Sequence, residues 1–229
     1  MSIYAIADLH LSFNTDKPMD IFGPNWENHA EKIKQDWLEK VNEQDTVLIP
    51  GDFSWETYLE DTYKDFEFLN SLPGRKILLK GNHDYWWSTS AKFYKFCNQN
   101  NFSNQWIMNN NCYEYNGYAL CGTRGWFFEE ERGSTHDEKI FKRELLRLEA
   151  SLRSAGELPK LVFLHYPPQY RGYECKEILD LLKAYDVRQC YYGHLHGASH
   201  ALAMEGQWDG IDYTLVSADR LNFKPYKIF

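Results

Sequence analysis

"YYGHLHGASH", residues 191–200, places two histidines one residue apart, directly after an apolar, strand-like run over residues 187–192. Residues i and i+2 of a strand share a face, so His194 and His196 can converge on one point. Gly193 and Gly197 flank the pair, and glycine allows the tight turn and close backbone approach that such a point requires. A polar turn after a buried strand explains the same residues equally well. The surrounding chain has to decide between the two interpretations.

The composition is that of a globular protein, with 43% hydrophobic and 25% charged residues among 229. No apolar run approaches the ~20 residues needed to span a membrane, and MSIYAIADLHLSF lacks the basic segment of a secretion signal. Five cysteines without a CxxC pair favour reduced thiols in the cytoplasm over disulfides or a structural zinc site. The net charge of −8 argues against a general nucleic-acid-binding protein. An anionic substrate would need local positive charge, which metal ions can supply.

Strand-like and helical patterns alternate over the first part of the chain. Strands are expected at 3–8, 46–50 and 76–80, and helices at 27–41 and 58–72. This order predicts a parallel sheet with crossover helices.

The remaining patterns continue the α/β character. Short strands are expected at 106–108, 112–115 and 118–121, with a hairpin turn at Asn116-Gly117. A long helix is expected between Thr135 and Gly156, another at 174–185, and strands at 160–165, 187–192, 200–204 and 211–216. The acidic run FFEEERG, residues 127–133, predicts an exposed loop. Because no segment resembles a linker, we expect a single domain over residues 1–229.

Polar side chains follow five of the expected strands at the point where each strand ends. In chain order these residues are Asp8 and His10, Asp52, Asn82 with His83 and Asp84, His165, and finally His194 and His196. The carboxyl ends of parallel strands line the ligand crevice of open α/β sheets. Asp and His together suit Mn²⁺, Fe or Zn²⁺. One structural zinc ion needs only four ligands, so the larger set indicates two metal ions that share a carboxylate.

In this order the motifs DxH, GD, GNHD, a lone histidine and GHxH resemble those of the calcineurin-like metallophosphoesterase family, over about the whole chain. The resemblance implies an α/β fold in which two mixed β-sheets pack as a sandwich flanked by helices, in four layers (αββα). It also implies one metal ion bound by Asp8, His10, Asp52 and His196, and a second bound by Asp52, Asn82, His165 and His194. His83 would carry no metal and would face the substrate.

The expected function is a metal-dependent phosphoesterase that hydrolyses a small phosphorylated substrate by attack of a hydroxide bridging two metal ions. Asp52 must be a carboxylate because it has to bind both ions. His83 is expected to protonate the departing oxygen, and Asp84 to support the site without binding a metal. Arg124, between two glycines in CGTRGW, either contacts phosphate or pairs with a surface carboxylate.

One motif departs from the best-known branch of the family. Protein Ser/Thr phosphatases carry GDxxDRG, in which the second Asp orients the catalytic histidine and the Arg binds phosphate. This chain has GDFSWE, with Trp55 and Glu56 at those positions. The departure argues against a phosphoprotein substrate and leaves open what orients His83. The runs GDxSW, GNHDYWW and GTRGW resemble a bacterial-type subgroup of predicted phosphohydrolases more closely.

Two alternative functions fit the same fold. A phosphodiesterase or nuclease would use the same ligand set, which does not separate diesters from monoesters. A non-catalytic scaffold would be expected to lose ligands, and none of the motif residues is missing here. The natural substrate, the metals bound and the oligomeric state are not determined by these motifs.

Overall fold

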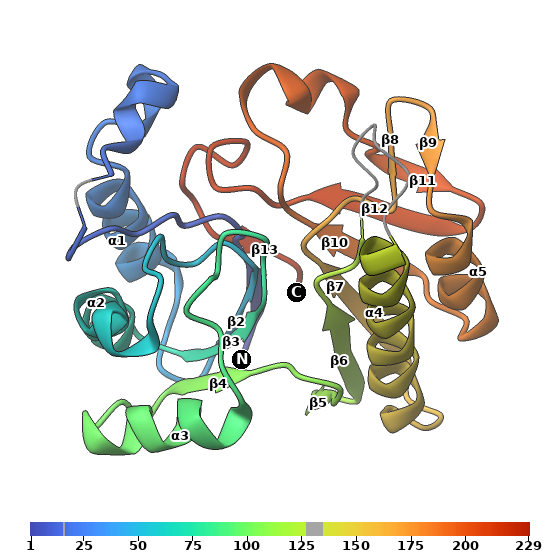
Figure 1. Cartoon of the computed structure of the whole chain (residues 1–229), viewed down its shortest axis with the longest axis horizontal. Coiled ribbons are helices and arrows are strands. Elements are labelled where there is room, and N and C mark those ends of the chain that lie inside the picture. Colours follow the sequence, from blue (N-terminus) through green and yellow to red (C-terminus); the bar gives the residue numbers. More distant parts are fainter. Residues whose placement is uncertain (16, 127–134) are drawn as a thin grey trace.

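The computed structural model describes residues 1–15, 17–126 and 135–229. Two β-sheets lie face to face, and helices cover the outer face of each (Figure 1). The acidic segment 127–133, predicted to be a loop, lies outside the described residues.

The first sheet has the strand order β13-β1-β2-β3-β4. The four strands β1 to β4 run parallel, and the C-terminal strand β13 is antiparallel to β1. The strands are β1 (Ile3–Ala5), β2 (Thr46–Pro50), β3 (Arg75–Leu79), β4 (Gln105–Ile107) and β13 (Tyr226–Lys227). The helices α1 (His29–Lys40), α2 (Tyr63–Ser71) and α3 (Ser90–Gln99) belong to this half. Every residue of β2 is buried, as expected for a parallel strand with both faces covered.

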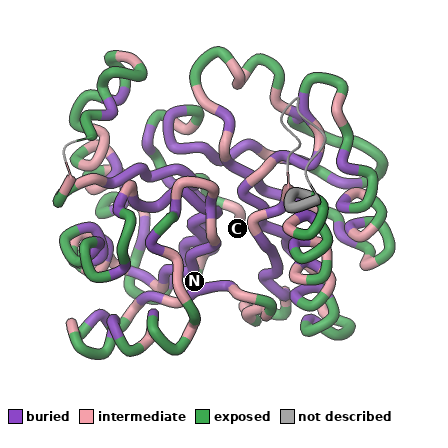
Figure 2. Tube along the Cα trace, viewed as in Figure 1, coloured by how far each residue is buried: buried purple, intermediate pink, exposed green. Residues whose placement is uncertain are grey.

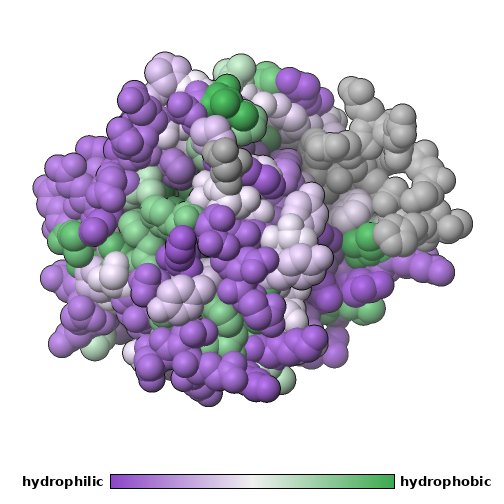
Figure 3. Space-filling view, turned by 60° about the vertical axis from the view of Figure 1, so that its left-hand side comes forward, coloured by the Kyte–Doolittle hydropathy of each residue, from purple (hydrophilic) through white to green (hydrophobic). Residues whose placement is uncertain are grey.

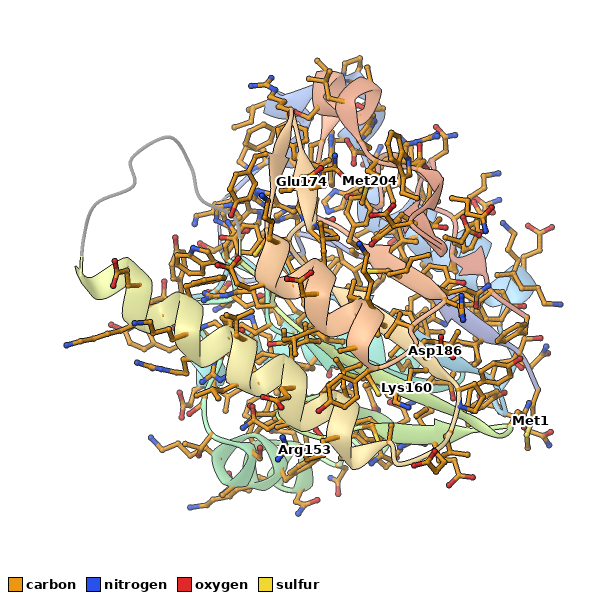
Figure 4. The ribbon with its side chains drawn as sticks, turned by 90° about the vertical axis from the view of Figure 1, so that its right-hand side faces the viewer. Met1, Arg153, Lys160, Glu174, Asp186 and Met204 are labelled. Carbon is orange, nitrogen blue, oxygen red and sulfur yellow. The ribbon has the colours of Figure 1, made fainter. Side chains whose placement is uncertain are left out.

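The second sheet has the order β11-β12-β10-β7-β6-β5, with antiparallel strands at its two edges. Its strands are β5 (Tyr113–Tyr115), β6 (Tyr118–Thr123), β7 (Lys160–Leu164), β10 (Gln189–Tyr192), β11 (Gly206–Trp208) and β12 (Ile211–Leu215). The helices α4 (Thr135–Ser154) and α5 (Lys176–Ala184) lie over its outer face, as Figure 4 shows from that side. A small hairpin, β8 (Gln169–Tyr170) with β9 (Tyr173–Glu174), precedes α5.

Three apolar cores lie between the four layers. One joins the two sheets and includes Ala5, Leu48 and Phe163. Another joins the first sheet to its helices through residues such as Trp37, and the third joins the second sheet to α4 and α5 through residues such as Leu148. Buried residues accordingly concentrate in the strands (Figure 2). The predicted α/β sandwich of two mixed sheets flanked by helices is confirmed.

Three local predictions need correction. Residues 200–204, expected to form a strand, lie mostly in a 3-10 helix, η4 (Gly197–Leu202). The strand lies later, as β11, because Asp209-Gly210 forms the hairpin turn to β12 with positive φ at both residues. The helix expected at 58–72 begins as a 3-10 turn, η3 (Leu59–Thr62), before α2. No helix was expected over α3.

The hairpin at Asn116-Gly117 is confirmed, with φ of 48° and 78° at the two residues. None of the described helices is long and apolar enough to cross a membrane. The face in Figure 3 is mainly hydrophilic, with hydrophobic areas that polar residues interrupt.

Candidate active site

The predicted site residues gather where strands of the two sheets end. Residues 8 and 10 follow β1, residue 52 follows β2, and residues 82–84 follow β3. The second sheet contributes residue 165 after β7 and residues 194 and 196 after β10. The structure therefore brings together side chains from five strand ends and from both sheets.

Left-handed backbone turns point these side chains inward. Four non-glycine residues of the site have positive φ: Asp8 at 60°, His10 at 45°, Asp52 at 52° and His194 at 73°. Each such conformation costs on the order of 1–3 kcal/mol and persists only where the surroundings enforce it. Conformational strain is thus concentrated at the candidate site.

Two motif glycines allow the backbone to approach the candidate ligands. A Cβ atom added at Gly81 would overlap Asp52 Oδ1, and one added at Gly193 would lie 2.6 Å from Asp8 Oδ2. Neither position has room for a side chain. The glycines of GNHD and GHLH are therefore required by close packing around two carboxylates.

Asp52 occupies the centre of the cluster. Its Oδ2 lies 3.8 Å from His10 Nε2 and 3.6 Å from His165 Nε2. Its Oδ1 accepts a hydrogen bond from the His83 backbone N–H at 2.8 Å. One carboxylate oxygen therefore faces imidazoles from both sheets, which is the placement that a ligand shared by two ions needs.

On one side of Asp52, three further side chains converge. Asn82 Oδ1 lies 2.6 Å from His165 Nε2 and 3.0 Å from His194 Nδ1. The other ring nitrogen of His165 lies 3.1 Å from the Pro50 carbonyl oxygen. A proton donated to that carbonyl leaves the His165 Nε2 lone pair directed into the cluster.

On the other side of Asp52, Asp8 lies with two histidines. His10 Nε2 and His196 Nε2 are 3.4 Å apart, and Asp8 Oδ1 is 3.9 Å from His196 Nε2. Asp8 is fixed through its other oxygen, which accepts the His194 backbone N–H at 2.9 Å.

Burial controls the protonation of this cluster. It raises the pKa of Asp8 to about 8 and that of Asp52 to about 6, because the charged carboxylates are removed from water. Burial also lowers the pKa of His165 to about 3 and that of His194 to about 2. Both imidazoles are thus neutral near pH 7, the form that binds a metal.

The residues present fit metal ions. Asp8 Oδ1 is buried and has no hydrogen-bond partner among the described residues, a state that is costly for a carboxylate unless a cation lies beside it. Ligand atoms of Asp8, His10 and His196 lie within 4.8 Å of one another, and so do those of Asp8, Asp52 and His165. These two clusters, which share Asp8, are consistent with a dimetal site. Their mixed oxygen and nitrogen donors suit Mn²⁺, Fe or Zn²⁺.

Asp84 is buried beside the cluster, and both of its carboxylate oxygens accept hydrogen bonds from N–H groups. Its Oδ2 accepts the backbone N–H groups of Asp52 at 2.9 Å and Gly81 at 2.7 Å. Its Oδ1 accepts those of Phe53 at 3.0 Å and Ser54 at 3.3 Å, and Trp86 Nε1–H at 2.9 Å. This carboxylate joins the loop after β2 to the loop after β3.

His83 is held by aromatic packing. The Trp55 ring lies 4.3 Å from the His83 ring and stacks on His10 at 4.9 Å between centroids. His83 Nδ1 is buried and has no hydrogen-bond partner within the described part of the chain. Burial lowers the pKa of His83, although the charge of Asp52 acts against this shift. Trp55, the residue at the position of the second aspartate of GDxxDRG, thus contacts the His83 ring.

Arg124 lies after β6, beside the candidate metal cluster. Its backbone carbonyl accepts the N–H groups of His165 at 3.1 Å and Tyr166 at 2.9 Å. Its guanidinium lies 3.6 Å from Glu144, a carboxylate that is only 2% exposed. The carboxylate it pairs with is therefore buried, not on the surface, and the side chain also lines a cavity.

Asp219 was not predicted from the sequence. Its carboxylate accepts hydrogen bonds from His196 Nδ1 at 2.9 Å and from the Gly197 N–H at 3.0 Å, and it lies 3.3 Å from His200 Nε2. Burial disfavours a charge on His196, but the bond to Asp219 and the charge of Asp8 outweigh burial and raise the pKa of His196 to about 9. Asp219 follows β12, so the same strand-end rule would have found it.

The fold is shared with solved structures of low sequence identity. A phosphopantetheinyl hydrolase from Mycobacterium tuberculosis is 14% identical with a TM-score of 0.59, and the match covers 100% of this chain and 95% of that one. A protein of unknown function from Aquifex aeolicus is 17% identical with a TM-score of 0.54 over 99% of this chain and 95% of its own. A protein from Thermus thermophilus is 13% identical with a TM-score of 0.57 over 98% of this chain and 96% of its own.

Sequence comparison identifies the family. No curated protein matches this chain. The sequence profile of the calcineurin-like phosphoesterases, in contrast, matches residues 1–198, a range that includes every motif at the strand ends from DxH to GHLH. The chain therefore belongs to the calcineurin-like phosphoesterase family.

Proposed function

We propose that the protein is a dinuclear metal-dependent phosphoesterase that hydrolyses a small phosphate ester. The observation that carries the proposal is the position of Asp52 Oδ2, 3.8 Å from His10 Nε2 of one cluster and 3.6 Å from His165 Nε2 of the other. A carboxylate with imidazoles on both sides suits two cations and has little use in a site for one. Because the side chains come from both sheets, we also propose that residues 1–229 act as one domain.

The first ion would be held by Asp8, His10, Asp52 and His196, and the second by Asp52, Asn82, His165 and His194. When bound, two such ions supply positive charge to phosphoryl oxygens and lower the pKa of a water that can attack phosphorus. Asn82 is a neutral ligand, so it preserves more of that positive charge than a third carboxylate would.

His83 is the proposed general acid. It lies next to Asn82 in the chain, and its backbone N–H donates a hydrogen bond to Asp52, so its backbone is fixed beside both proposed metal positions. Tilted packing against Trp55 restricts the ring without an acidic partner. Its lowered pKa makes the imidazolium a stronger acid toward a departing oxygen.

The test is metal analysis together with turnover. The purified chain, reconstituted with Mn²⁺, Fe²⁺ or Zn²⁺, should bind two ions and hydrolyse p-nitrophenyl phosphate or bis-p-nitrophenyl phosphate. Asp52→Asn should weaken both ions and abolish turnover, whereas His10→Ala should chiefly affect one ion. Full activity with a single ion, or normal rates in Asp52→Asn, would refute the dinuclear assignment.

The two nitrophenyl esters also separate the alternatives. Turnover of the diester alone would identify a phosphodiesterase or nuclease on the same site. Two bound ions with no turnover of either ester, or of a panel of phosphorylated metabolites and nucleotides, would favour a non-catalytic scaffold.

The proposal also includes a cytoplasmic location and a bacterial-type subgroup of the family. All five cysteines are free, and four of them are buried, which supports a reducing compartment such as the cytoplasm. The runs GDxSW, GNHDYWW and GTRGW support placement in a bacterial-type subgroup of the family.

A further inference from the structure

A cavity of about 390 Å³ opens between the end of β3, the end of β6, the start of α3 and the middle of α4. Its lining includes three basic side chains, Lys80, Arg124 and Arg147, and one acidic side chain, Glu144. The full chain, in contrast, carries 33 acidic and 25 basic residues. Three positive charges less one negative charge give this cavity a net charge of +2 in a protein of net charge −8.

Glu144 organises the two guanidinium groups. It is 2% exposed, and its Oε1 lies 2.6 Å from Arg147 Nη1 and 3.6 Å from Arg124 Nη2. Its other oxygen accepts a hydrogen bond from Thr123 Oγ1 at 2.8 Å. A buried carboxylate that is fixed at both oxygens holds the arginines in place and leaves most of their donors for another partner.

Residues that line this cavity carry unused donors. The Nε of Arg124 is buried and has no hydrogen-bond partner within residues 1–15, 17–126 and 135–229, and the side chain is 16% exposed. Over the same residues Lys80 makes no hydrogen bond or ion pair through its side chain. Ser88, Thr89 and Asn109 add hydroxyl and amide groups to the lining. The cavity therefore presents charged and polar donors with few acceptors.

Two links place residues of the cavity lining close to the candidate metal cluster. Lys80 precedes Asn82 by two residues, which span at most about 7 Å of backbone. The Arg124 carbonyl accepts the His165 N–H at 3.1 Å. A small molecule whose phosphoester lies at the cluster can therefore reach the cavity with a second group.

We propose that this cavity binds a second phosphate group of the substrate, so that the enzyme acts on small molecules that carry two phosphates. The inference rests on the proposed phosphoesterase activity. A phosphate monoester carries about −1.5 to −2 charges near pH 7, which matches the net charge of the cavity, whereas a carboxylate carries only one. Guanidinium groups bind phosphate through paired hydrogen bonds, and two of them are available here.

The first test measures inhibition, which does not require that the test compounds are cleaved. Glucitol 6-phosphate, 6-phosphogluconate and glucitol 1,6-bisphosphate differ only in a hydroxyl, carboxylate or phosphate at C1. Each is added to the metal-loaded protein during nitrophenyl ester hydrolysis. We expect the bisphosphate to inhibit at least about tenfold more strongly than the monophosphate, the usual size of a charged hydrogen bond. The bisphosphate can place either of its two phosphates at the metal cluster, which alone accounts for a twofold stronger inhibition. A preference for the bisphosphate of twofold or less, or equal inhibition by the bisphosphate and by 6-phosphogluconate, would overturn the proposal.

Arg147→Gln is the informative variant, because Arg147 is 36% exposed and the glutamine removes the charge but keeps an N–H donor for Glu144. The preference for the bisphosphate over the monophosphate should fall at least about fivefold in this variant. Arg143→Gln is the matched control, since it removes the same charge from an exposed position of α4 outside the cavity. A preference that changes less than twofold in Arg147→Gln, or equally in both variants, would overturn the proposal.

A second test separates this inference from the proposed function. Inorganic phosphate is titrated calorimetrically into the EDTA-treated full chain, in which only protein groups can bind it. Binding should be present in the wild type and in Arg143→Gln, and should weaken about tenfold in Arg147→Gln. Phosphate binding without metal-dependent hydrolysis would refute the phosphoesterase and retain the anion site. Absence of binding to the wild-type chain would refute the anion site by itself.

Discussion

Asp84→Asn tests whether one buried carboxylate holds the loops that carry the candidate ligands. Both oxygens of Asp84 accept hydrogen bonds, two at Oδ2 and three at Oδ1. All five partners are N–H groups, so the side chain must act as an acceptor at both oxygens. Asparagine has nearly the same shape but offers only one acceptor oxygen and places an NH₂ group at the other position.

The loss can be worked out from these contacts. If the amide oxygen occupies the Oδ1 position, the N–H groups of Asp52 and Gly81 lose their acceptor and face another donor. Each buried N–H without a partner costs about 1–3 kcal/mol, so the free energy of unfolding should fall by about 2–6 kcal/mol. Because Asp52 and Asn82 lie on the two loops concerned, metal binding and turnover should fall as well.

Urea denaturation of the metal-free protein measures the stability loss, and metal analysis with nitrophenyl ester kinetics measures the functional loss. Asp180→Asn, an exposed substitution on α5, is the matched control and should change the free energy of unfolding by less than about 0.5 kcal/mol. A loss below about 1 kcal/mol in Asp84→Asn, with normal metal content, would show that the five hydrogen bonds do not fix the loops.

Three further predictions concern single residues. Lys76 is fully buried, and burial lowers its pKa from 10.5 to about 7; at this residue the unfolded chain therefore binds more protons between these values, and the contribution of Lys76 to stability should rise by about 1.4 kcal/mol per pH unit there. Lys76→Met should lack this contribution, so urea titrations should show a larger difference in the free energy of unfolding between wild type and variant at pH 9 than at pH 7. An equal difference at the two pH values would contradict the reasoning. Asp219→Asn should reduce metal affinity about 10–100-fold, as measured by chelator competition, because it loosens His196, whereas Glu205→Gln on the surface should have no such effect. His83→Ala should slow alkyl phosphate esters by about 10²-fold but p-nitrophenyl esters much less; equal losses, or a loss of metal, would exclude a general acid.

The sequence was most informative where local chemistry and topology agree. Alternating strands and helices require parallel strands, and parallel strands bring their carboxyl ends to one edge. Residues as distant as Asp8 and Asn82 could therefore be placed together without a structure, whereas the contact of Asp8 with His194 depends on how the two sheets pack. The same rule would have found Asp219 had it been applied to the strand that ends before residue 216.

Other features depend on tertiary packing that no local pattern encodes. No local pattern assigns Trp55 to the site, and only the fold brings its ring against both His10 and His83. The basic lining of the cavity depends on Arg147 of α4 lying near Arg124, which follows β6. This placement is set by the angle at which the helix crosses the sheet, and the sequence of the helix alone does not predict that angle. The prediction of a strand at 200–204 was wrong because Asp209-Gly210 sets the register of the hairpin between β11 and β12.

The division of the candidate ligands between two sheets has a consequence for the order of folding. Asp8, His10, Asp52 and Asn82 belong to a sheet built almost entirely from the first half of the chain, whereas the three remaining histidines belong to a sheet built from the second half. Neither half alone holds either complete set of proposed ligands, so each proposed metal site is completed only when the sheets dock. Interactions formed after the transition state slow unfolding and leave folding unchanged. Metal ions should therefore lengthen the lifetime of the native protein without accelerating its formation.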